Sequence, residues 1–361
     1  MPETTTAPSG RGASERLSVG FLAHVEHSGI TADQGGVRSR GLETGIDLFA
    51  LAEDQGYDAG YVHTRHLQAS LASPLPFLAA VGQRVPRIDL GVQVIPLRFE
   101  NAGRLAEDLA TTDLLIGGRL RAGVSSGYSA HDAVNIRAFG EVPGNTREHI
   151  DRVLSDLLSF LDGEIVSLAD EHTETLKAGT AMRVQPQVET LHSRMAYGAA
   201  TTSSAELAGS HGLGLQVGTL QPDDGSGRSF EELQREVIDT YREASRKAGH
   251  GDGHVSVGRQ MIPVTEENEL EYYSDIIERD RARGGRTTEE HRGIEVGGRD
   301  AVFGRVIVDD PEVILEHLAE DVALADADEL VLTLPIDEDP GKIGRIVRLF
   351  AEHVIPEVPR R

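Results

Sequence analysis

The chain has 361 residues, no cysteine and a formal net charge of −24 at pH 7. The absence of cysteine excludes disulfides, thiolate metal ligands and a cysteine nucleophile, and is compatible with a cytoplasmic location. The negative charge disfavours nucleic-acid binding, which depends on clustered Lys and Arg, and no apolar run is long enough for a membrane span. We therefore expect neither a nucleic-acid nor a membrane partner.

The first segment, residues 1–16, is rich in Pro, Gly, Ser and Thr. It lacks the apolar stretch that a signal peptide needs, so its composition predicts a disordered tail. Residues 17–361 carry regular patterns almost to the last residue and are predicted to form a single domain.

Eight times along the chain, an apolar run of strand character is followed by a helical pattern. The first four strand and helix pairs cover residues 17–23 and 45–56, 58–63 and 74–83, 88–95 and 102–118, and 120–126 and 145–161. After an irregular segment at about 162–190, the others cover residues 194–200 and 203–212, 213–219 and 229–249, 254–264 and a long polar helical region, and 328–335 and 341–355. Alternating strands and helices imply parallel pairing, so the pattern predicts a (β/α)8 TIM barrel, with a doubly wound open sheet as the alternative.

A second irregular segment, residues 263–305, follows the seventh strand and contains the mixed-charge stretch "RDRARGGRTTEEHRG". Long insertions at the C-terminal face of a barrel are often lids. The segment is therefore either a lid with hinges at Gly284 and Gly285 or a solvated surface insertion.

The C-terminal ends of the strands, here called the mouth, carry the chemistry in TIM barrels. Two of these ends read "HVEH" (His24 to His27) and "HTRH" (His63 to His66). Two imidazoles three residues apart on an extended segment do not converge on one ion. We therefore predict no metal site, and a metal-dependent hydrolase remains only a further alternative.

The fifth strand leads into the hydroxyl-rich run "GAATTSSAELAG", Gly198 to Gly209. One Ser or Thr is enough to cap a helix, and this run offers four hydroxyls. The run is either a generously capped helix or a cradle for an anion, such as a phosphate, at a helix N-terminus.

The stretch "GRLAEDLATTDLLIGGRLRAGVSSGY" resembles a signature shared by the bacterial luciferase-like, flavin-dependent monooxygenases. Segments around the second, third and fifth strands and the C-terminal "FAEHVIPEV" agree with that family in order. The resemblance covers Leu17 to Val358 and implies a luciferase-like TIM barrel with insertions at its C-terminal face.

The resemblance also implies particular cofactor-binding residues. The family has a non-prolyl cis peptide beneath the flavin ring at the end of the third strand, which here corresponds to Gln93 and Val94. Its flavin phosphate is held after the fifth strand by backbone amides and a hydroxyl, which correspond to Ala200, Thr201 and Ser204.

Residues after the second and fourth strands depart from the family pattern. Ser126, beside Ser125, stands where the family often has an Arg near the phosphate, and Tyr128 is predicted to flank the ring. Where luciferase-like members often read Glu-His-His, this chain reads Thr-Arg-His, which argues against luciferase activity itself. The predicted catalytic residues are His66, as acid, base or hydrogen-bond donor, and Arg65, as a group that binds an anionic substrate or polarises a carbonyl.

The function implied by the resemblance is a monooxygenase that uses O2 and reduced FMN, delivered by a flavin reductase, on a small-molecule substrate. The family commonly forms homodimers. One alternative is a hydride-transfer enzyme that depends on F420, whose polyanionic tail would favour more basic residues at the mouth than this sequence offers. Another alternative is a flavin-binding protein without turnover.

Overall fold

The structure is a computed structural model that describes residues 17–33, 35–127, 132–142, 144–172, 175–266, 268–284, 291–296, 299–336 and 338–358. The tail predicted at residues 1–16, the predicted ring contact Tyr128 and the hinge Gly285 lie outside the described residues. Among the helices of the described part, none is both long and apolar enough to span a membrane.

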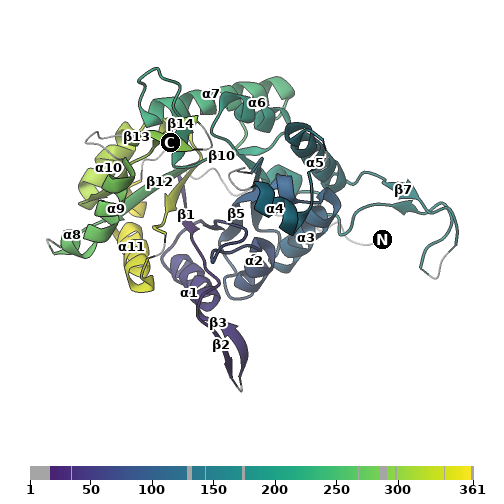
Figure 1. Cartoon of the computed structure of the whole chain (residues 1–361), viewed down its shortest axis with the longest axis horizontal. Coiled ribbons are helices and arrows are strands. Elements are labelled where there is room, and N and C mark those ends of the chain that lie inside the picture. Colours follow the sequence, from purple (N-terminus) through teal and green to yellow (C-terminus); the bar gives the residue numbers. More distant parts are fainter. Residues whose placement is uncertain are drawn as a thin grey trace, which may run out of the picture.

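Eight parallel strands form a closed barrel at the centre of the molecule (Figure 1). In chain order they are β1 (Ser18–Ala23), β4 (Ala59–Val62), β5 (Asp89–Pro96), β6 (Leu120–Ser125), β9 (Ala196–Gly198), β10 (Gly214–Val217), β12 (Val255–Pro263) and β16 (Glu329–Thr333). Each strand pairs with the next, and β16 pairs with β1 from Ser18↔Glu329 to Leu22↔Thr333, which closes the ring. The predicted TIM barrel is confirmed, and the open-sheet alternative is wrong.

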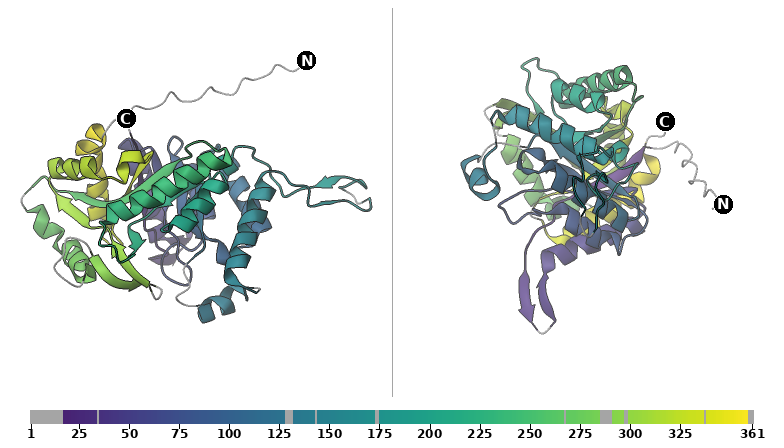
Figure 2. Two further views of the ribbon diagram at one scale, coloured as in Figure 1. Left: turned by 90° about the horizontal axis from the view of Figure 1, so that it is seen from above. Right: turned by 90° about the vertical axis from the view of Figure 1, so that its right-hand side faces the viewer.

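Helices follow the strands and surround the barrel (Figures 1 and 2). They are α1 (Arg40–Asp54), α2 (Pro74–Gly82), α3 (Ala102–Leu115), α5 (Thr146–Leu161), α6 (Thr202–Ser210), α7 (Phe230–Ala248), α10 (Pro311–Glu320) and α11 (Pro340–His353). Side-chain caps define several of their starts. Asn101 and Asn145 accept hydrogen bonds from first-turn amides of α3 and α5, and Ser229 forms a reciprocal capping box with Glu232 in α7.

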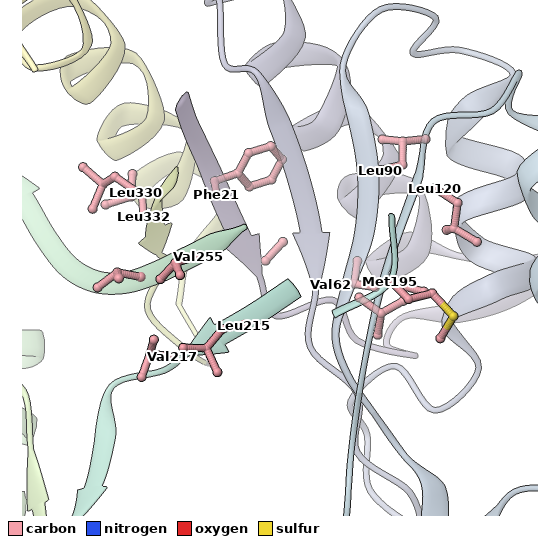
Figure 3. Packing of buried hydrophobic residues seen from close by; sticks show 14 of the residues in the cluster. Phe21, Val62, Leu90, Leu120, Met195, Leu215, Val217, Val255, Leu330 and Leu332 are labelled. Atoms are coloured by element: carbon pink, nitrogen blue, oxygen red, sulfur yellow. The ribbon is translucent and has the colours of Figure 1, made fainter. Parts of the chain in front are cut away.

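The core has two layers because side chains alternate between the two faces of each strand. The outer layer lies between the strands and the helices, where Phe21 of β1 meets Phe49 of α1 with ring centroids 4.9 Å apart. Figure 3 shows labelled members of this large buried cluster, among them Phe21 and Leu330. The inner layer fills the barrel with Leu22, Ala59, Tyr61 and Val331.

The N-terminal end of the barrel interior, here called the bottom, holds a buried polar network. The Tyr61 hydroxyl lies 2.9 and 3.0 Å from the two carboxylate oxygens of Glu329, and the Ser256 hydroxyl donates to the same carboxylate. Burial raises the pKa of Glu329 above its ordinary value. Beside this group, the Arg121 guanidinium pairs with Asp89 at 2.9 Å. The bottom is therefore polar, but its polar groups are hydrogen-bonded or ion-paired with one another.

Two hairpins that the sequence did not predict project from the barrel (Figures 1 and 2). The first, β2 (Ile30–Asp33) with β3 (Gly36–Ser39), lies in the loop after β1. The second, β7 (Ser167–Leu168) with β8 (Ala181–Met182), lies in the segment 162–190 that we expected to be irregular. Most of their side chains are exposed, so neither hairpin has the apolar alternation that would have revealed it.

Other insertions lie at the mouth. The described elements are α4 (Asp132–Phe139) after β6, α8 (Glu269–Tyr272), α9 (Ser274–Gly284), β13 (His291–Val296) and β14 (Arg299–Phe303) after β12, and β15 (Val306–Asp309), which pairs with the end of β12. The strand β14 pairs with β11 (Leu220–Pro222), so segment 263–305 is tied to the loop after the sixth barrel strand. Its helical part was expected and its small sheet was not. Its role as a lid stays a prediction.

Candidate functional site

The central feature of the mouth is a bulge in β5. The peptide bond between Gln93 and Val94 is cis, which confirms the prediction made from the resemblance. The register between β5 and β6 shifts between Val92 and Ile95, so the two residues stand out of the regular pairing. The bulge therefore presents backbone and the Val94 side chain at the mouth.

Two residues at the end of β4 hold this bulge. The Thr64 hydroxyl donates to the carbonyl oxygen of Val94 at 2.7 Å, and His63 Nδ1 lies 3.0 Å from the carbonyl oxygen of Gln93. Because a carbonyl only accepts, Nδ1 carries the proton. The guanidinium of Arg65 donates to His63 Nε2 at 3.2 Å, which fits the same tautomer. Arg65 was predicted to belong to the site, whereas the roles of His63 and Thr64 were not predicted.

The histidines beside the bulge are neutral at pH 7. The rings of His24 and His63 lie 5.2 Å apart, and burial, with smaller contributions from the neighbouring His63 and Arg65, lowers the pKa of His24 to about 3. Burial also lowers the pKa of His63. Neutral imidazoles allow His63 to keep the tautomer that holds Gln93. Within the described residues, no group of three or more His, Asp or Glu side chains is arranged for a metal ion.

The predicted catalytic His66 lies in an aromatic cluster near this group. Its ring centroid is 5.5 Å from that of Phe99, in a short 3-10 helix (Leu97–Phe99) after β5, and 4.8 Å from that of Phe139 in α4. Burial lowers its pKa, and its buried Nε2 has no hydrogen-bond partner in the described part of the chain. His66 thus offers one unused polar atom in apolar surroundings, while Arg65 is exposed.

The ends of β6 and β9 complete the neighbouring wall. Val94 packs against Gly198, where an added Cβ would lie 2.9 Å from Val94 Cγ1 and 3.7 Å from the Cβ of Ser125. The Ser125 hydroxyl accepts from the amide of Gly127 at 3.2 Å. Ser126 lies beside Tyr197, a β9 residue that was predicted only as part of an apolar run. The structure therefore brings Val94, Ser125 and Gly198 together.

The hydroxyl-rich run after β9 begins helix α6, and Thr201 is its N-cap. The Thr201 hydroxyl accepts from the amide of Ser204 at 3.3 Å and donates to the Ser204 hydroxyl at 3.1 Å. The first-turn amides of Thr202 and Ser203 have no intrahelical acceptor, and both of these residues are exposed. One hydroxyl is thus used as the cap, and the other hydroxyls and amides surround the positive end of the helix dipole.

These groups are of the chemical type that binds a flavin phosphate. Neutral hydroxyls and first-turn amides at a helix N-terminus bind phosphate without a carboxylate to repel it. The run that contains Ala200, Thr201 and Ser204 follows β9, and the bulge lies two strands away along the same sheet. A planar ring over Val94 and an anion at α6 are therefore compatible with one ligand that crosses the ends of β5, β6 and β9.

Comparisons with known proteins identify a family and its distant relatives. Residues 18–324 match the family described as luciferase-like monooxygenase. The F420-dependent glucose-6-phosphate dehydrogenase of Microbacterium testaceum is 22% identical over 339 residues, covering 88% of this chain and 93% of that protein.

Two solved structures share the fold. A monooxygenase from Streptomyces bottropensis superposes with a TM-score of 0.68 at 20% identity, over 94% of this chain and 99% of that chain. The oxygenating constituent of 3,6-diketocamphane monooxygenase from Pseudomonas putida, in complex with FMN, has a TM-score of 0.68 at 14% identity, over 96% of this chain and 100% of that chain.

Proposed function

Because the chain belongs to the luciferase-like monooxygenase family, we propose that it is an oxidoreductase that uses reduced FMN and O2 to oxygenate a small organic molecule. The observation that carries this proposal is the position of the Gln93–Val94 bulge on the same wall as the hydroxyl-rich start of α6. A separate flavin reductase would deliver the reduced FMN.

The residues at the mouth have distinct roles in this proposal. Reduced flavin supplies the electrons that activate O2 when it is bound. Val94 supports the ring, while His63 and Thr64 fix the two carbonyls of the bulge and so act as positioning residues. The amides of Ala200 and Thr201 and the hydroxyl of Ser204 hold the phosphate.

His66 and Arg65 act on the substrate side. A neutral His66, with Nε2 without a partner among the described residues, would donate or accept one proton or hydrogen bond beside the rings of Phe99 and Phe139. Arg65 is exposed and cationic, so it would bind an anionic group of the substrate or polarise its carbonyl. Since Ser126 replaces an arginine near the phosphate, we expect modest FMN affinity.

A second candidate is an F420-dependent oxidoreductase that transfers hydride without O2. It is favoured by the similarity to an F420-dependent dehydrogenase over 88% of this chain. A titration of the purified protein with FMN, riboflavin and F420, followed by fluorescence, discriminates the two. Tighter binding of FMN than of riboflavin or F420 supports the proposal, and a clear preference for F420 replaces it.

Oxygen consumption then tests turnover. With a reductase that regenerates reduced FMN, the enzyme should increase substrate-dependent O2 uptake and form an oxygenated product. FMN binding without any product would leave a flavin-binding protein. Sedimentation of the same sample would test the homodimer that we expect for this chain.

A further inference from the structure

A groove of about 770 Å³ runs between α1 and α11 on the outside of the barrel. The two helices pack side by side (Figure 1). The groove begins at the mouth, where His24 and Leu334 border it, and descends between the helices to Leu51 and Arg348. Its volume lies within the range of small-molecule sites. The residues assigned to the flavin lie on strands β5, β6 and β9, so this groove is a separate feature.

The wall of the groove is apolar over most of its length. Leu48 and Leu51 of α1 face it from one side and Ile343 of α11 from the other, and all three are only partly buried. Leu334, which is fully buried, closes the upper part of the floor. Partly buried aliphatic side chains of this kind favour an apolar ligand, because covering them removes apolar surface from water.

Two guanidinium groups that line the groove are available to a ligand. Within the described residues, neither Arg40 nor Arg348 makes an ion pair or a side-chain hydrogen bond. Two acidic residues that border the groove already have partners. Asp47 pairs with Arg84 at 2.9 Å, and Glu338 pairs with Lys342 at 3.3 Å and with Arg279. Glu26 also borders the groove at its mouth end.

Gly344 keeps the lower part of the groove open. It lies inside α11, where glycine is less favourable than alanine. An added Cβ would make only ordinary contacts, at 3.6 Å from both Arg348 Nη1 and Leu51 Cδ2. Helix packing therefore does not require a glycine here, in contrast to Gly45, whose Cβ would lie 2.9 Å from Val25 Cγ1. The missing side chain leaves space beneath the Arg348 guanidinium.

We propose that this groove binds an amphipathic carboxylate, with the carboxylate on Arg348 and the apolar chain along Leu51, Ile343 and Leu48 towards the mouth. Eight helical residues separate Pro340 at the mouth from Arg348, a rise of about 12 Å. The far end of the chain then reaches His24, whose ring lies beside His63 at the flavin bulge. The binding of this ligand does not rest on the proposed function.

Calorimetric titration of the full chain with decanoate, without any flavin, tests the binding. We expect saturable binding of decanoate and much weaker binding of 1-decanol, which has a chain of the same length without the charge. Arg348→Gln should weaken decanoate binding about tenfold or more, because it removes a charge-assisted hydrogen bond. Arg40→Gln, nearer the mouth, should weaken it less. The matched control Arg152→Gln, an exposed position on α5, should leave it unchanged.

Filling the groove gives an independent test. Gly344→Leu should abolish decanoate binding while the thermal unfolding temperature stays at or above that of the wild type, and Gly344→Ala should bind with intermediate affinity. No decanoate binding by the wild type, or equal binding by Arg348→Gln, would overturn the proposal. A concentration-dependent dimer that only Gly344→Leu abolishes would also overturn it, because the groove would then be an interface between copies.

The same variants separate this proposal from the function. FMN affinity should be unchanged in Arg348→Gln, since Arg348 lies in the groove and not among the residues assigned to the phosphate. Decanoate binding with no FMN binding would leave the groove proposal intact and reject the flavin proposal. FMN binding with no decanoate binding would reject the groove proposal and leave the flavin proposal intact.

Discussion

The two ends of the barrel are both polar, yet they are polar in different ways. At the bottom, Tyr61, Ser256 and Glu329 hydrogen-bond to one another, and Arg121 pairs with Asp89. At the mouth, His66 Nε2 is buried without a partner in the described chain, and the first-turn amides of Thr202 and Ser203 in α6 have no intrahelical acceptor. Closed networks of this kind stabilise a fold, whereas open groups are available to a ligand. The contrast predicts which substitutions affect stability and which affect binding.

The largest effect should come from disrupting the hydrogen-bond network at the bottom of the barrel. Glu329→Ala leaves the buried hydroxyls of Tyr61 and Ser256 without their acceptor, so we expect the free energy of unfolding to fall by about 3 kcal/mol. Urea denaturation measures this, and the folded fraction should bind FMN as the wild type does. Glu329→Gln keeps an acceptor oxygen and should lose much less. A variant with normal stability but weakened FMN binding would reverse the assignment of the two ends.

The second largest effect should come from a residue at the mouth and should concern ligand binding. Ser204→Ala removes a hydroxyl proposed to hold the FMN phosphate, at a cost of roughly 1.5 to 3 kcal/mol, or about ten to a hundredfold in affinity. Riboflavin, which has no phosphate, should bind as before, and stability should change little because Thr201 is the cap. Fluorescence titration with both ligands measures the selectivity. An unchanged preference for FMN over riboflavin would show that Ser204 serves only the helix.

Thr201 caps α6 and is also one of the residues proposed to bind the phosphate. Its substitution should therefore have a smaller effect than that of Ser204, and one that is less selective for ligand binding. Thr201→Ala removes the N-cap of α6 and should lower the free energy of unfolding by about 1 kcal/mol. Thr201→Ser retains the hydroxyl and should stay close to the wild type. Thermal unfolding of both variants checks this, and a loss of the same size in Thr201→Ser would show that the methyl group matters instead of the cap.

The smallest effect concerns pH, and the two ends should respond with opposite signs. The folded state resists protonation of His24, so the contribution of His24 to the free energy of unfolding should rise as pH increases towards 6.5. The folded state favours the protonated form of Glu329, so its contribution should fall as pH rises above 4.5. Each change should be about 1 kcal/mol or less over one pH unit. Urea denaturation between pH 4.5 and 7.5 should show a smaller rise in the free energy of unfolding below pH 6.5 in His24→Gln, and a smaller decline with rising pH in Glu329→Gln.

The sequence was informative where burial produces a pattern. Barrel strands such as β1 and β4 are buried on both faces, so they appear as nearly continuous apolar runs that are easily found. The β2–β3 hairpin is exposed on nearly every side chain and produces no pattern. Likewise, the hydroxyl-rich run predicted the start of α6, but its four hydroxyls are equivalent in sequence and only the structure shows that Thr201 is the cap.

Long-range contacts explain what could not be predicted at the site. His63 and Thr64 contact the bulge across 30 residues of sequence, and no local pattern reports such a contact. The cis peptide was predicted only through the family resemblance, since the residues "VQVI" have no distinctive composition. His66 was chosen for its residue type, and its enclosure by Phe99 and Phe139 depends on α4, which was not predicted.

Closure of the barrel by β1 and β16 also determines when the protein is complete during its synthesis. β1 leaves the ribosome early, but its partner β16 begins at Glu329, more than three hundred residues later. Until then one edge of β1 has no strand to pair with, and the carboxylate that Tyr61 needs in the interior has not been made. An unpaired apolar edge is prone to wrong pairing with other chains, and such distant contacts slow folding. We therefore expect nascent chains of this protein to depend on chaperones until their last strand has emerged.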